Sequence, residues 1–548
     1  MRQALTKGQL SFFELNGVNE KCDIIKPNIV VENNIDFPLN LLKYDTYDLE
    51  KYKQDVLNYG LKQTWNAINY CVLYYGISNN FLSVDNFAQL YEIGLALQDK
   101  RSKKESGQYY TPNDVAIVMS EWLQKQKGEI VCDVGCGTGN LILSYLNLIG
   151  NKKAIDLIRS GRLYLYDIDD VALSICKTII LFKYGKELEP YIHTIRCDFL
   201  SNKITLPNNC KVIANPPYST INSLSLDWNK TEVALDSKEL YSMFMEKIIK
   251  QSESAVIITP YSFVGGSKFY SLRKIMNDYN GFVISFDNVP GNIFRGKKHG
   301  IFNTNTANSV RAAITVVENK DDCRGFKTTP LIRFKNEERT KFLKTAVLES
   351  LINDEYQIVT NENPMYCKCA KELRLVWNYW KTKSTQRLGN CVNQDGQYIL
   401  SMPNTCRYYT SASYGKMNRA GQIVLNINDK DVFNYIYCLI NSSFAYWYWR
   451  LFDGGITYTK KLLLSMPIFY DKLSDEDIEF FNNVATEMIN ETNKYTVTKN
   501  NVGIQENVKY PRQFRDKINR KLLDILGLNI DEKIFDIIHS NMAMEINV

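Results

Sequence analysis

The 548-residue sequence has no uninterrupted apolar run of the roughly 20 residues that a membrane-spanning helix needs. Its start, Met1–Lys7, leads into no apolar block of the kind found in signal peptides. We therefore expect a cytoplasmic protein without a membrane partner. A chain of 548 residues is longer than one ordinary domain. Hydrophobic residues make up 45% of it, which is enough for two or three cores.

The sequence also lacks the residue spacings of a metal site. Its 13 cysteines are scattered and include no Cys-x-x-Cys pair, and its three histidines are isolated. Cys367 and Cys369 form the closest pair, and several other cysteines lie in apolar runs, where reduced and mostly buried thiols are expected. We therefore predict that no metal is bound.

The most informative cluster that is present is Asn215-Pro216-Pro217-Tyr218, which follows the apolar run 211–214. This pattern indicates a strand whose end carries an amide, a rigid backbone and an aromatic ring. The Asn215 side-chain oxygen and the Pro216 carbonyl can accept hydrogen bonds from an exocyclic amine, while the Tyr218 ring offers a stacking face. The cluster suits a planar substrate with an NH2 group, although such a turn is also found as a simple exit from a sheet.

A glycine-rich turn lies upstream of this cluster. Residues 130–140 run from an apolar stretch that contains Asp133, through Gly135, Gly137 and Gly139, into a helical pattern. Glycines let the backbone approach a ligand closely, and the helix beyond them offers free N–H groups. The spacing Gly-x-Gly-x-Gly differs from the dinucleotide fingerprint Gly-x-Gly-x-x-Gly, which argues against a nicotinamide or flavin site.

Two further strand-like runs end on acidic residues. The run 162–166 ends on Asp167, at the distance from the glycines at which a carboxylate can accept from both hydroxyls of a ribose. A later run ends on Asp198 and Phe199, a carboxylate able to accept from an adenine amino group beside a ring able to stack on it. Taken singly, either pair could be ordinary turn and core.

Taken in order, these residues resemble the S-adenosylmethionine-dependent DNA adenine-N6 methyltransferases of the gamma class, which occur in bacterial restriction-modification systems. In that family a Tyr/Phe-Thr-Pro segment precedes the glycine loop, as residues 107–112 do here. The segment 290–298 resembles the one whose aromatic residue, here Phe294, helps to hold the target base, although 299–308 looks like an insertion. The resemblance implies an S-adenosylmethionine site formed by Tyr110, Thr111, Pro112, Asp133, Gly135, Gly137, Gly139, Asp167, Ile168, Asp198 and Phe199.

The resemblance also implies the fold and the domain order. We expect a Rossmann-like α/β methyltransferase domain over residues 106–325, with a mostly parallel seven-stranded sheet. A mainly helical region should precede it at residues 1–105. An α+β target-recognition domain with a helical tail should follow at 326–548, and the apolar segment 432–449 should be one of its core helices.

The implied reaction is methyl transfer to adenine N6 in double-stranded DNA at a short specific sequence. The base must be flipped out, because its amino group is paired inside the duplex. Tyr218 and Phe294 would clamp the base, while Asn215 and the carbonyl of Pro216, held rigid by Pro217, would bind its amine. No general base is needed before attack, so catalysis consists mainly of positioning.

The charge pattern places the DNA contacts in the C-terminal part. The net charge of +6 is modest, but residues 367–461 hold thirteen Lys and Arg against five Asp and Glu, a difference of +8. Within them, 407–416 interleaves aromatic and small polar residues, which suits phosphates and base edges, although a solvated loop looks similar. We predict DNA contacts at Arg407, Lys416 and Arg419, with Arg407 as the preferred base reader.

Other functions share parts of this pattern. A type I modification subunit has the same segments but needs a separate specificity subunit. Methyltransferases that act on protein glutamine or on guanine N2 of ribosomal RNA share the tetrad, but they are usually compact. A DNA-binding module with a relic fold is disfavoured because every expected motif is intact. Residues 1–105 show no nuclease motif, so a partner restriction subunit would have to supply any cleavage.

Overall fold

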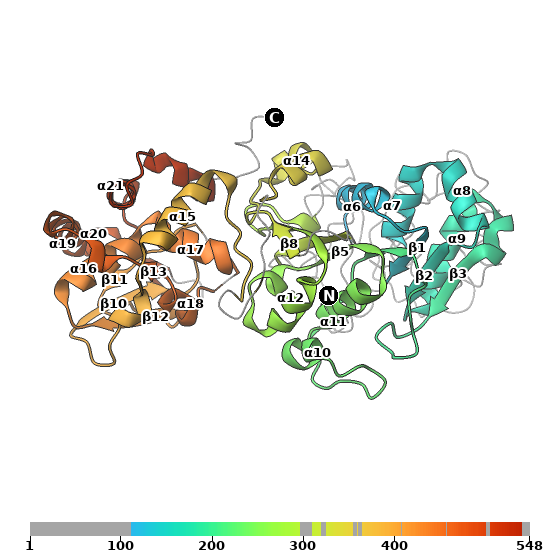
Figure 1. Cartoon of the computed structure of the whole chain (residues 1–548), viewed down its shortest axis with the longest axis horizontal. Coiled ribbons are helices and arrows are strands. Elements are labelled where there is room, and N and C mark those ends of the chain that lie inside the picture. Colours follow the sequence, from blue (N-terminus) through green and yellow to red (C-terminus); the bar gives the residue numbers. More distant parts are fainter. Residues whose placement is uncertain are drawn as a thin grey trace, which may run out of the picture. The chain divides into compact units, whose positions relative to one another are not determined.

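The computed structural model describes residues 111–295, 310–318, 325–353, 359, 364–406, 408–455, 457–499 and 505–539. The predicted helical region 1–105, Tyr110 and Arg407 lie outside these residues. The chain divides into two compact units (Figure 1). None of the described helices is long and apolar enough to cross a membrane. The first unit holds the described residues up to Phe263 and those of Lys268–Phe326 and Lys335–Glu349, and the second holds Val264–Ser267, Lys327–Phe334 and the described residues from Ser350 onward.

An eight-stranded sheet with the order β3-β2-β1-β4-β5-β7-β6-β8 forms the centre of the first unit. Strands β1 to β5 pair in parallel, whereas β7 runs antiparallel to both β5 and β6. The predicted mostly parallel α/β fold is therefore confirmed, with eight strands instead of seven because β8 adds to one edge. The strands are β1 (Ile130–Val134), β2 (Leu163–Asp167), β3 (Ile192–Arg196), β4 (Cys210–Ala214), β5 (Ser254–Pro260), β6 (Asn280–Phe286), β7 (Ala312–Glu318) and β8 (Gly325–Thr328).

The central strands are short apolar runs because both of their faces are covered. All positions of β4 are buried, and so are all positions of β1 except its first. Helix α6 buries Val115, Val118, Met119 and Trp122, whose spacing of three or four residues places them on one face. The described α-helices of this unit are α6 (Asn113–Lys125), α7 (Asn140–Ile149), α8 (Asn151–Arg159), α9 (Asp170–Tyr184), α10 (Glu232–Ser237), α11 (Leu240–Gln251), α12 (Tyr270–Met276), α13 (Arg339–Phe342) and α14 (Thr345–Ser350). Among its 3-10 turns, η7 (Ile293–Arg295) carries Phe294.

Parallel pairing brings the carboxyl ends of β1, β2 and β4 to the same edge of the sheet. Val134 in β1 lies opposite both Tyr166 in β2 and Ala214 in β4. The segments that follow these strands are the glycine loop, the turn at Asp167 and the tetrad that begins at Asn215. In an open α/β sheet this edge is where ligands bind, so the fold gathers the predicted site residues.

The second unit combines short strands with helices around a core rich in aromatic rings. Its strands form three small sheets with the orders β11-β10-β12, β13-β9 and β14-β15. This is the α+β composition that the sequence predicts. The elements are α15 (Arg374–Lys383), β9 (Gln386–Arg387), β10 (Tyr398–Pro403), β11 (Ser413–Tyr414), β12 (Gln422–Ile427), α16 (Lys430–Asn441), α17 (Ser443–Phe452), α18 (Lys460–Leu464), β13 (Pro467–Ile468), α19 (Asp475–Asn490), α20 (Thr492–Tyr495), β14 (Thr496–Lys499), β15 (Gln505–Val508), α21 (Arg512–Ile525) and α22 (Asp536–His539).

The single core helix predicted over residues 432–449 is wrong, because the structure divides this segment into two helices. Helix α16 ends at Asn441 and α17 begins at Ser443. Ser442 between them has an extended backbone, and its hydroxyl accepts a hydrogen bond from the Phe444 N–H at 3.1 Å. Serine in this position is a preferred N-cap, so it starts a new helix in the middle of an apolar run.

The Trp380 side chain should carry a large share of the stability of the second unit. It is fully buried, its ring centre lies 5.0 Å from that of Phe444 and 5.9 Å from that of Trp447, and its N–H donates to the Pro467 carbonyl at 3.1 Å. We expect Trp380→Ala to lower the unfolding free energy of this unit by about 3–5 kcal/mol. Denaturant unfolding followed by tryptophan fluorescence measures the change.

The neighbouring residue Tyr379 offers a matched control, because 47% of its surface is exposed. Tyr379→Ala should change the unfolding free energy by no more than about 0.5 kcal/mol. Equal losses for the two variants would contradict the assignment of Trp380 to the core of this unit.

Candidate active site

The glycine loop and the tetrad lie close together at adjacent strand ends. A methyl group built on Gly135 would lie 3.8 Å from the backbone oxygen of Asn215. The N–H groups of Gly135 and Cys136 both donate to the Tyr166 carbonyl, at 2.8 and 3.0 Å, which joins the loop to β2 as well. The three segments that the sequence singles out therefore form one site.

Thr111 sets the orientation of the Asn215 side chain. The Asn215 Nδ2 donates to the buried Thr111 Oγ1 at 2.9 Å. The Thr111 carbonyl in turn accepts from Asn140 Nδ2 at 2.6 Å, which attaches the Thr-Pro segment to the start of α7. The bond from Nδ2 fixes the plane of the amide, and hence the direction in which its accepting oxygen points.

The two aromatic rings predicted to hold a base lie side by side. The Tyr218 and Phe294 ring centres are 5.8 Å apart and the rings meet edge to face, at 65°. The Tyr218 hydroxyl donates to the Ile258 carbonyl at 3.3 Å, which anchors its ring to the end of β5. Because the two rings contact each other in this arrangement, a planar base can pass between them only if the Phe294 ring turns away.

The backbone of the glycine loop favours glycine at all three of its positions. Gly135, Gly137 and Gly139 have positive φ angles, +69°, +52° and +91°, which side chains disfavour. A Cβ atom on Gly139 would also clash with the Cys176 sulfur. The backbone conformation thus explains all three glycines, and the close approach of α9 to the loop is a second reason for the last one.

Asp167 joins the loop to β2 and lies beside an exposed apolar side chain. Its carboxylate accepts from the Gly137 N–H at 2.7 Å and from the Asp169 N–H at 2.9 Å, while burial raises its pKa. The next residue, Ile168, is 65% exposed. An acid beside an exposed apolar surface is the pair expected where a ribose and a base bind.

Asp133 is fully buried at the end of β1 and has one carboxyl oxygen without a hydrogen bond. Its Oδ2 accepts from the Ile142 N–H at 3.1 Å, whereas no described residue donates to Oδ1. Burial raises the pKa of this carboxyl to about 8, and the nearby Asp167 contributes in the same direction. A buried carboxyl oxygen without a partner is costly, so it fits a ligand whose positively charged amino group favours loss of the Asp133 proton and then donates to the carboxylate.

Asp198 and Phe199 differ in their access to the site. The Asp198 carboxylate accepts from the Leu200 N–H at 3.0 Å and from the Trp228 indole N–H at 2.6 Å. The Phe199 ring is only 3% exposed and packs against Phe244. In this arrangement Phe199 supports the turn from inside, and Ile168 is the exposed apolar surface beside the site.

Arg339 is a residue of this site that the sequence analysis did not select. It is fully buried, and its guanidinium donates to both carboxylate oxygens of Asp114, at 2.5 and 2.9 Å. It also donates to the carbonyls of Asn292 and Ile293, at 3.0 and 2.6 Å. Asp114 follows the Thr-Pro segment and Ile293 precedes Phe294, so one side chain holds both segments.

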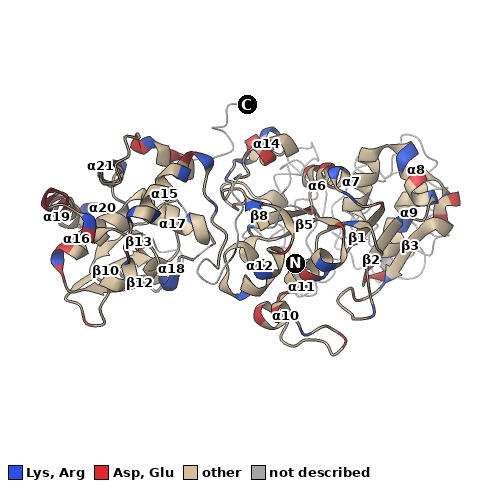
Figure 2. Cartoon of the chain, in the orientation of Figure 1, with Lys and Arg blue, Asp and Glu red and all other residues tan. Residues whose placement is uncertain are grey.

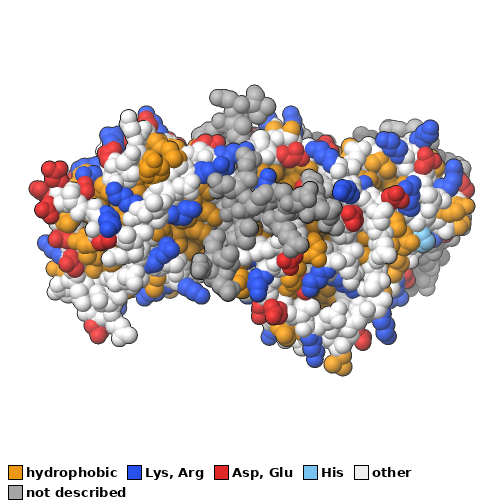
Figure 3. All heavy atoms as spheres, in the orientation of Figure 1, with side chains coloured by type: hydrophobic (Ala, Val, Ile, Leu, Met, Phe, Trp, Pro, Cys, Tyr) orange, Lys and Arg blue, Asp and Glu red, His pale blue; other side chains and the backbone are white. Residues whose placement is uncertain are grey.

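The predicted DNA contacts lie in the second unit and differ in availability. Lys416 is exposed, whereas Arg419 donates to the Gly421 and Glu506 carbonyls, at 3.0 and 3.2 Å, and so holds its own turn against β15. Lys368, counted in the basic segment, is buried. Basic and acidic residues are both spread over the elements of this unit (Figure 2). On the face shown in Figure 3 they are likewise interspersed, without a large patch of one sign.

No group of three His, Cys, Asp or Glu side chains within the described residues is arranged to hold a metal ion. The cysteines of this part of the chain are free thiols, including Cys367 and Cys369.

Comparison with known proteins assigns the family. Residues 82–376 match the family described as N-6 DNA Methylase, which is more than half of the chain. The chain belongs to this family. The match begins before the described residues and ends in α15, so it includes Arg339.

Individual relatives are distant. The chain is 27% identical to the type II methyltransferase M.VspI of a Vibrio species over 210 residues, which cover 36% of this chain and 47% of that protein. It is 22% identical over 240 residues to the methylase subunit of the type I restriction enzyme MpnII of Mycoplasma pneumoniae, covering 39% and 42%. It thus spans less than half the length of these relatives. Among solved structures it resembles that of the DrdV–DNA complex, with 15% identity, a TM-score of 0.42 and coverage of 64% of this chain and 42% of that one.

The raised pKa of Asp133 predicts a pH dependence of stability. The folded protein keeps this proton up to about pH 8, whereas an unfolded chain releases it near 3.8. The wild type therefore loses stability as pH rises through this interval, while Asp133→Asn does not. We expect the unfolding free energy of the variant minus that of the wild type to grow up to about pH 8 and then to level off.

Thermal unfolding of both proteins without ligand, across this pH interval, measures the difference. A difference that stays constant with pH would contradict a protonated Asp133 in the folded protein.

Proposed function

We propose that this protein transfers a methyl group from S-adenosylmethionine to N6 of an adenine in double-stranded DNA, at a short specific sequence and in the gamma-class manner. The observation that carries the proposal is the Asn215 amide, oriented by Thr111 and placed beside the Tyr218 ring, next to the glycine loop. Membership of the N-6 DNA methylase family supports it. A location in the cytoplasm, where bacterial DNA lies, is part of the proposal.

The residues at the sheet edge fit S-adenosylmethionine. When bound, it would supply a methyl group on a positively charged sulfur, which leaves as a neutral thioether. Asp133 would accept from the amino group of the ligand through its unsatisfied oxygen. Asp167 would accept from the ribose hydroxyls, and the exposed Ile168 would cover the adenine ring. Asp198 would contact the adenine amino group.

The target base would bind on the tetrad side of the site. Asn215 Oδ1 and the Pro216 carbonyl would accept from the amine and hold its nitrogen toward the donor. Pro216 and Pro217 keep the backbone rigid, so this geometry needs no rearrangement on binding. The base would stack on Tyr218 once the Phe294 ring has turned, and its proton would leave after methyl transfer.

A second candidate function is that of a modification subunit within a type I system. The similarity to the MpnII methylase subunit favours it. In our main proposal, residues 326–548 contain the target-recognition domain, with Lys416 among its DNA contacts and Arg407 as the preferred base reader. Sequence-specific methylation by the purified chain alone separates the two, because a modification subunit would need a partner specificity subunit.

We expect Asn215→Ala to lower methyl transfer by about a hundredfold or more, because the amine loses an acceptor made for the transition state. The measurement is transfer of tritiated methyl groups to DNA, combined with single-molecule sequencing of DNA from cells that express the chain, which reports the base and the motif. Asn222→Ala, at an exposed asparagine after the tetrad, is the matched control. Near-normal transfer by Asn215→Ala would overturn the assignment.

Thr111 should act through Asn215. Thr111→Val keeps the shape of the side chain but removes the hydroxyl that accepts from Asn215 Nδ2. We expect kcat to fall by about 10- to 100-fold, since small errors of position are costly in such a step. Although Thr111 is among the residues expected near the methyl donor, its hydroxyl is engaged by Asn215, so the dissociation constant of the donor, measured by calorimetry, should change little.

Thr111→Ser retains the hydroxyl and should restore most of the rate. If Thr111→Val keeps near-normal kcat while Thr111→Ser loses activity, the methyl group of Thr111 matters and its hydrogen bond does not.

A further inference from the structure

The second unit contains a cavity of about 270 Å³ where α21 begins. One wall is formed by residues 409–411 and another by residues 509–512, with Arg515 one turn into the helix. Pro511 occupies the N-cap position of α21, so the first N–H groups of a 14-residue helix lie at this wall. The wall at 409–411 belongs to the basic segment that the sequence singles out.

Arg515 is an unpaired cation in this cavity. Its Nε is buried and has no hydrogen-bond partner, and the side chain forms no ion pair with any described residue. Burial holds the pKa of its guanidinium below the ordinary value. A charge removed from water in this way is costly unless an anion accompanies it.

Further donors line the same cavity. Lys509 is exposed and forms no ion pair with the described residues. Ser411 is buried, and Tyr409 is half-buried near Arg515, which opposes the effect of burial on the tyrosine pKa. None of the described residues that line the cavity is an Asp or a Glu. A cavity lined by hydrogen-bond donors, with no acidic side chain among its described residues, is suited to bind an anion.

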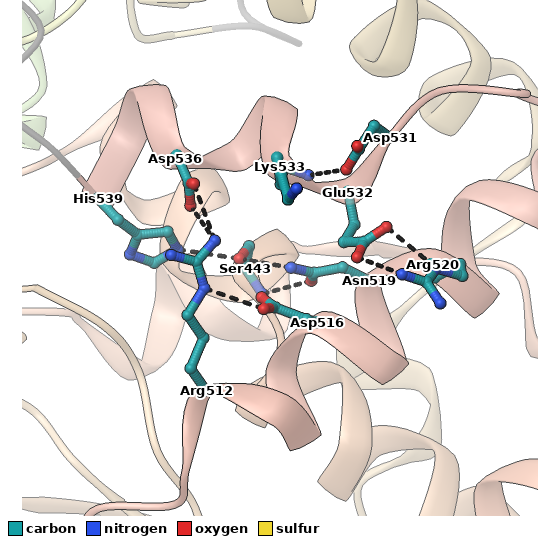
Figure 4. Close-up of polar contacts among 10 residues, drawn as sticks. All are labelled: Ser443, Arg512, Asp516, Asn519, Arg520, Asp531, Glu532, Lys533, Asp536 and His539. Atoms are coloured by element: carbon teal, nitrogen blue, oxygen red, sulfur yellow. Dashed lines mark hydrogen bonds and ion pairs between the residues drawn. The ribbon is translucent and has the colours of Figure 1, made fainter.

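The nearby carboxylates are already paired with a different arginine. Arg512 donates to Asp516 at 2.9 Å and to both oxygens of Asp536, at 2.6 and 2.8 Å (Figure 4). The positive charge of Arg515 acts on His539, which Figure 4 also shows. The pKa of this histidine is lowered to about 3, first by burial and then by this guanidinium. Asp516 and Asp536 also attract the Arg515 guanidinium, but their ion pairs within the described residues are with Arg512, so Arg515 has no anion in direct contact.

We propose that this cavity binds a phosphate group of the DNA backbone, held by Arg515 and Lys509 with the hydroxyls of Ser411 and Tyr409. A planar guanidinium can donate two hydrogen bonds to one phosphate, and a helix N-terminus adds favourable N–H groups. The volume exceeds that of one phosphate, which leaves space for water or a flanking sugar. The assignment to DNA rests on the proposed function, since a free phosphate ion has the same chemistry.

The first test is the salt dependence of DNA binding. The dissociation constant of a short duplex that contains the methylated motif is measured at several salt concentrations. For Arg515→Gln and for Lys509→Gln, we expect affinity to fall about five- to tenfold and the slope of log K against log salt to decrease by about 0.9, as for one lost phosphate contact. Arg515→Lys, which keeps the charge, should lose less than Arg515→Gln.

Lys430→Gln is the control for net charge, because Lys430 is exposed in the same unit but does not line the cavity. An equal loss in this control would overturn the proposal. Since Lys509 is on the surface, its variant remains informative even if Arg515→Gln does not fold. An unchanged slope for Lys509→Gln would also overturn it.

The second test identifies the phosphate. Single methylphosphonate linkages, which are neutral, are placed along each strand of the duplex. One position should weaken binding by the wild type and have no further effect on Lys509→Gln. If no position behaves in this way but inorganic phosphate binds to the wild type and not to the variant, the site takes a free ion and the assignment to DNA is wrong. A wild type that binds DNA but transfers no methyl group would instead refute the proposed function and leave the cavity proposal intact.

Discussion

The guanidinium of Arg339 is the interaction on which the geometry of the candidate active site depends. It joins Asp114, in the first turn of α6, to the backbone that carries Phe294. The same turn of chain holds Thr111, whose hydroxyl orients Asn215. A buried charge is tolerated only when its hydrogen bonds are satisfied, and Arg339 donates four. The Arg339 guanidinium therefore holds both the segment that orients the Asn215 amide and the segment that carries the Phe294 ring.

This dependence explains why the segment Lys335–Glu349 belongs to the first unit although it follows the last strand of the sheet. Glu349 accepts from the Trp122 indole N–H at 2.7 Å and pairs with Lys125 at 2.9 Å, while Thr345 donates to Glu121 at 2.9 Å. These contacts fasten the segment along α6. The first unit thus includes residues beyond 325.

In the second unit, too, contacts with a buried core hold a proposed binding site in place. Aromatic rings surround α17, which is buried along its whole length. The wall of the phosphate cavity is attached to the end of the adjoining helix α16, because Thr410 donates to the Ile440 carbonyl at 2.7 Å and Asn441 accepts from the Ala412 N–H at 2.9 Å. Donors on a fixed wall lose little entropy when an anion binds.

The sequence by itself determined the strand ends and what they carry. Apolar runs that end on Gly135, Asp167 and Asn215 predict parallel strands with a site at one edge, because strand burial and turn chemistry are local properties. Contacts between residues far apart in the sequence have no local pattern that predicts them. Arg339 lies 225 positions from Asp114 within an ordinary charged run, and only the tertiary structure brings the two together. Serine is a known N-cap residue, so the start of a helix after Ser442 could have been predicted, but the apolar run around it favoured one continuous helix. Burial of Phe199 and exposure of Arg515 to a cavity were likewise decided by packing, since a residue's neighbours across the fold depend on how distant segments meet.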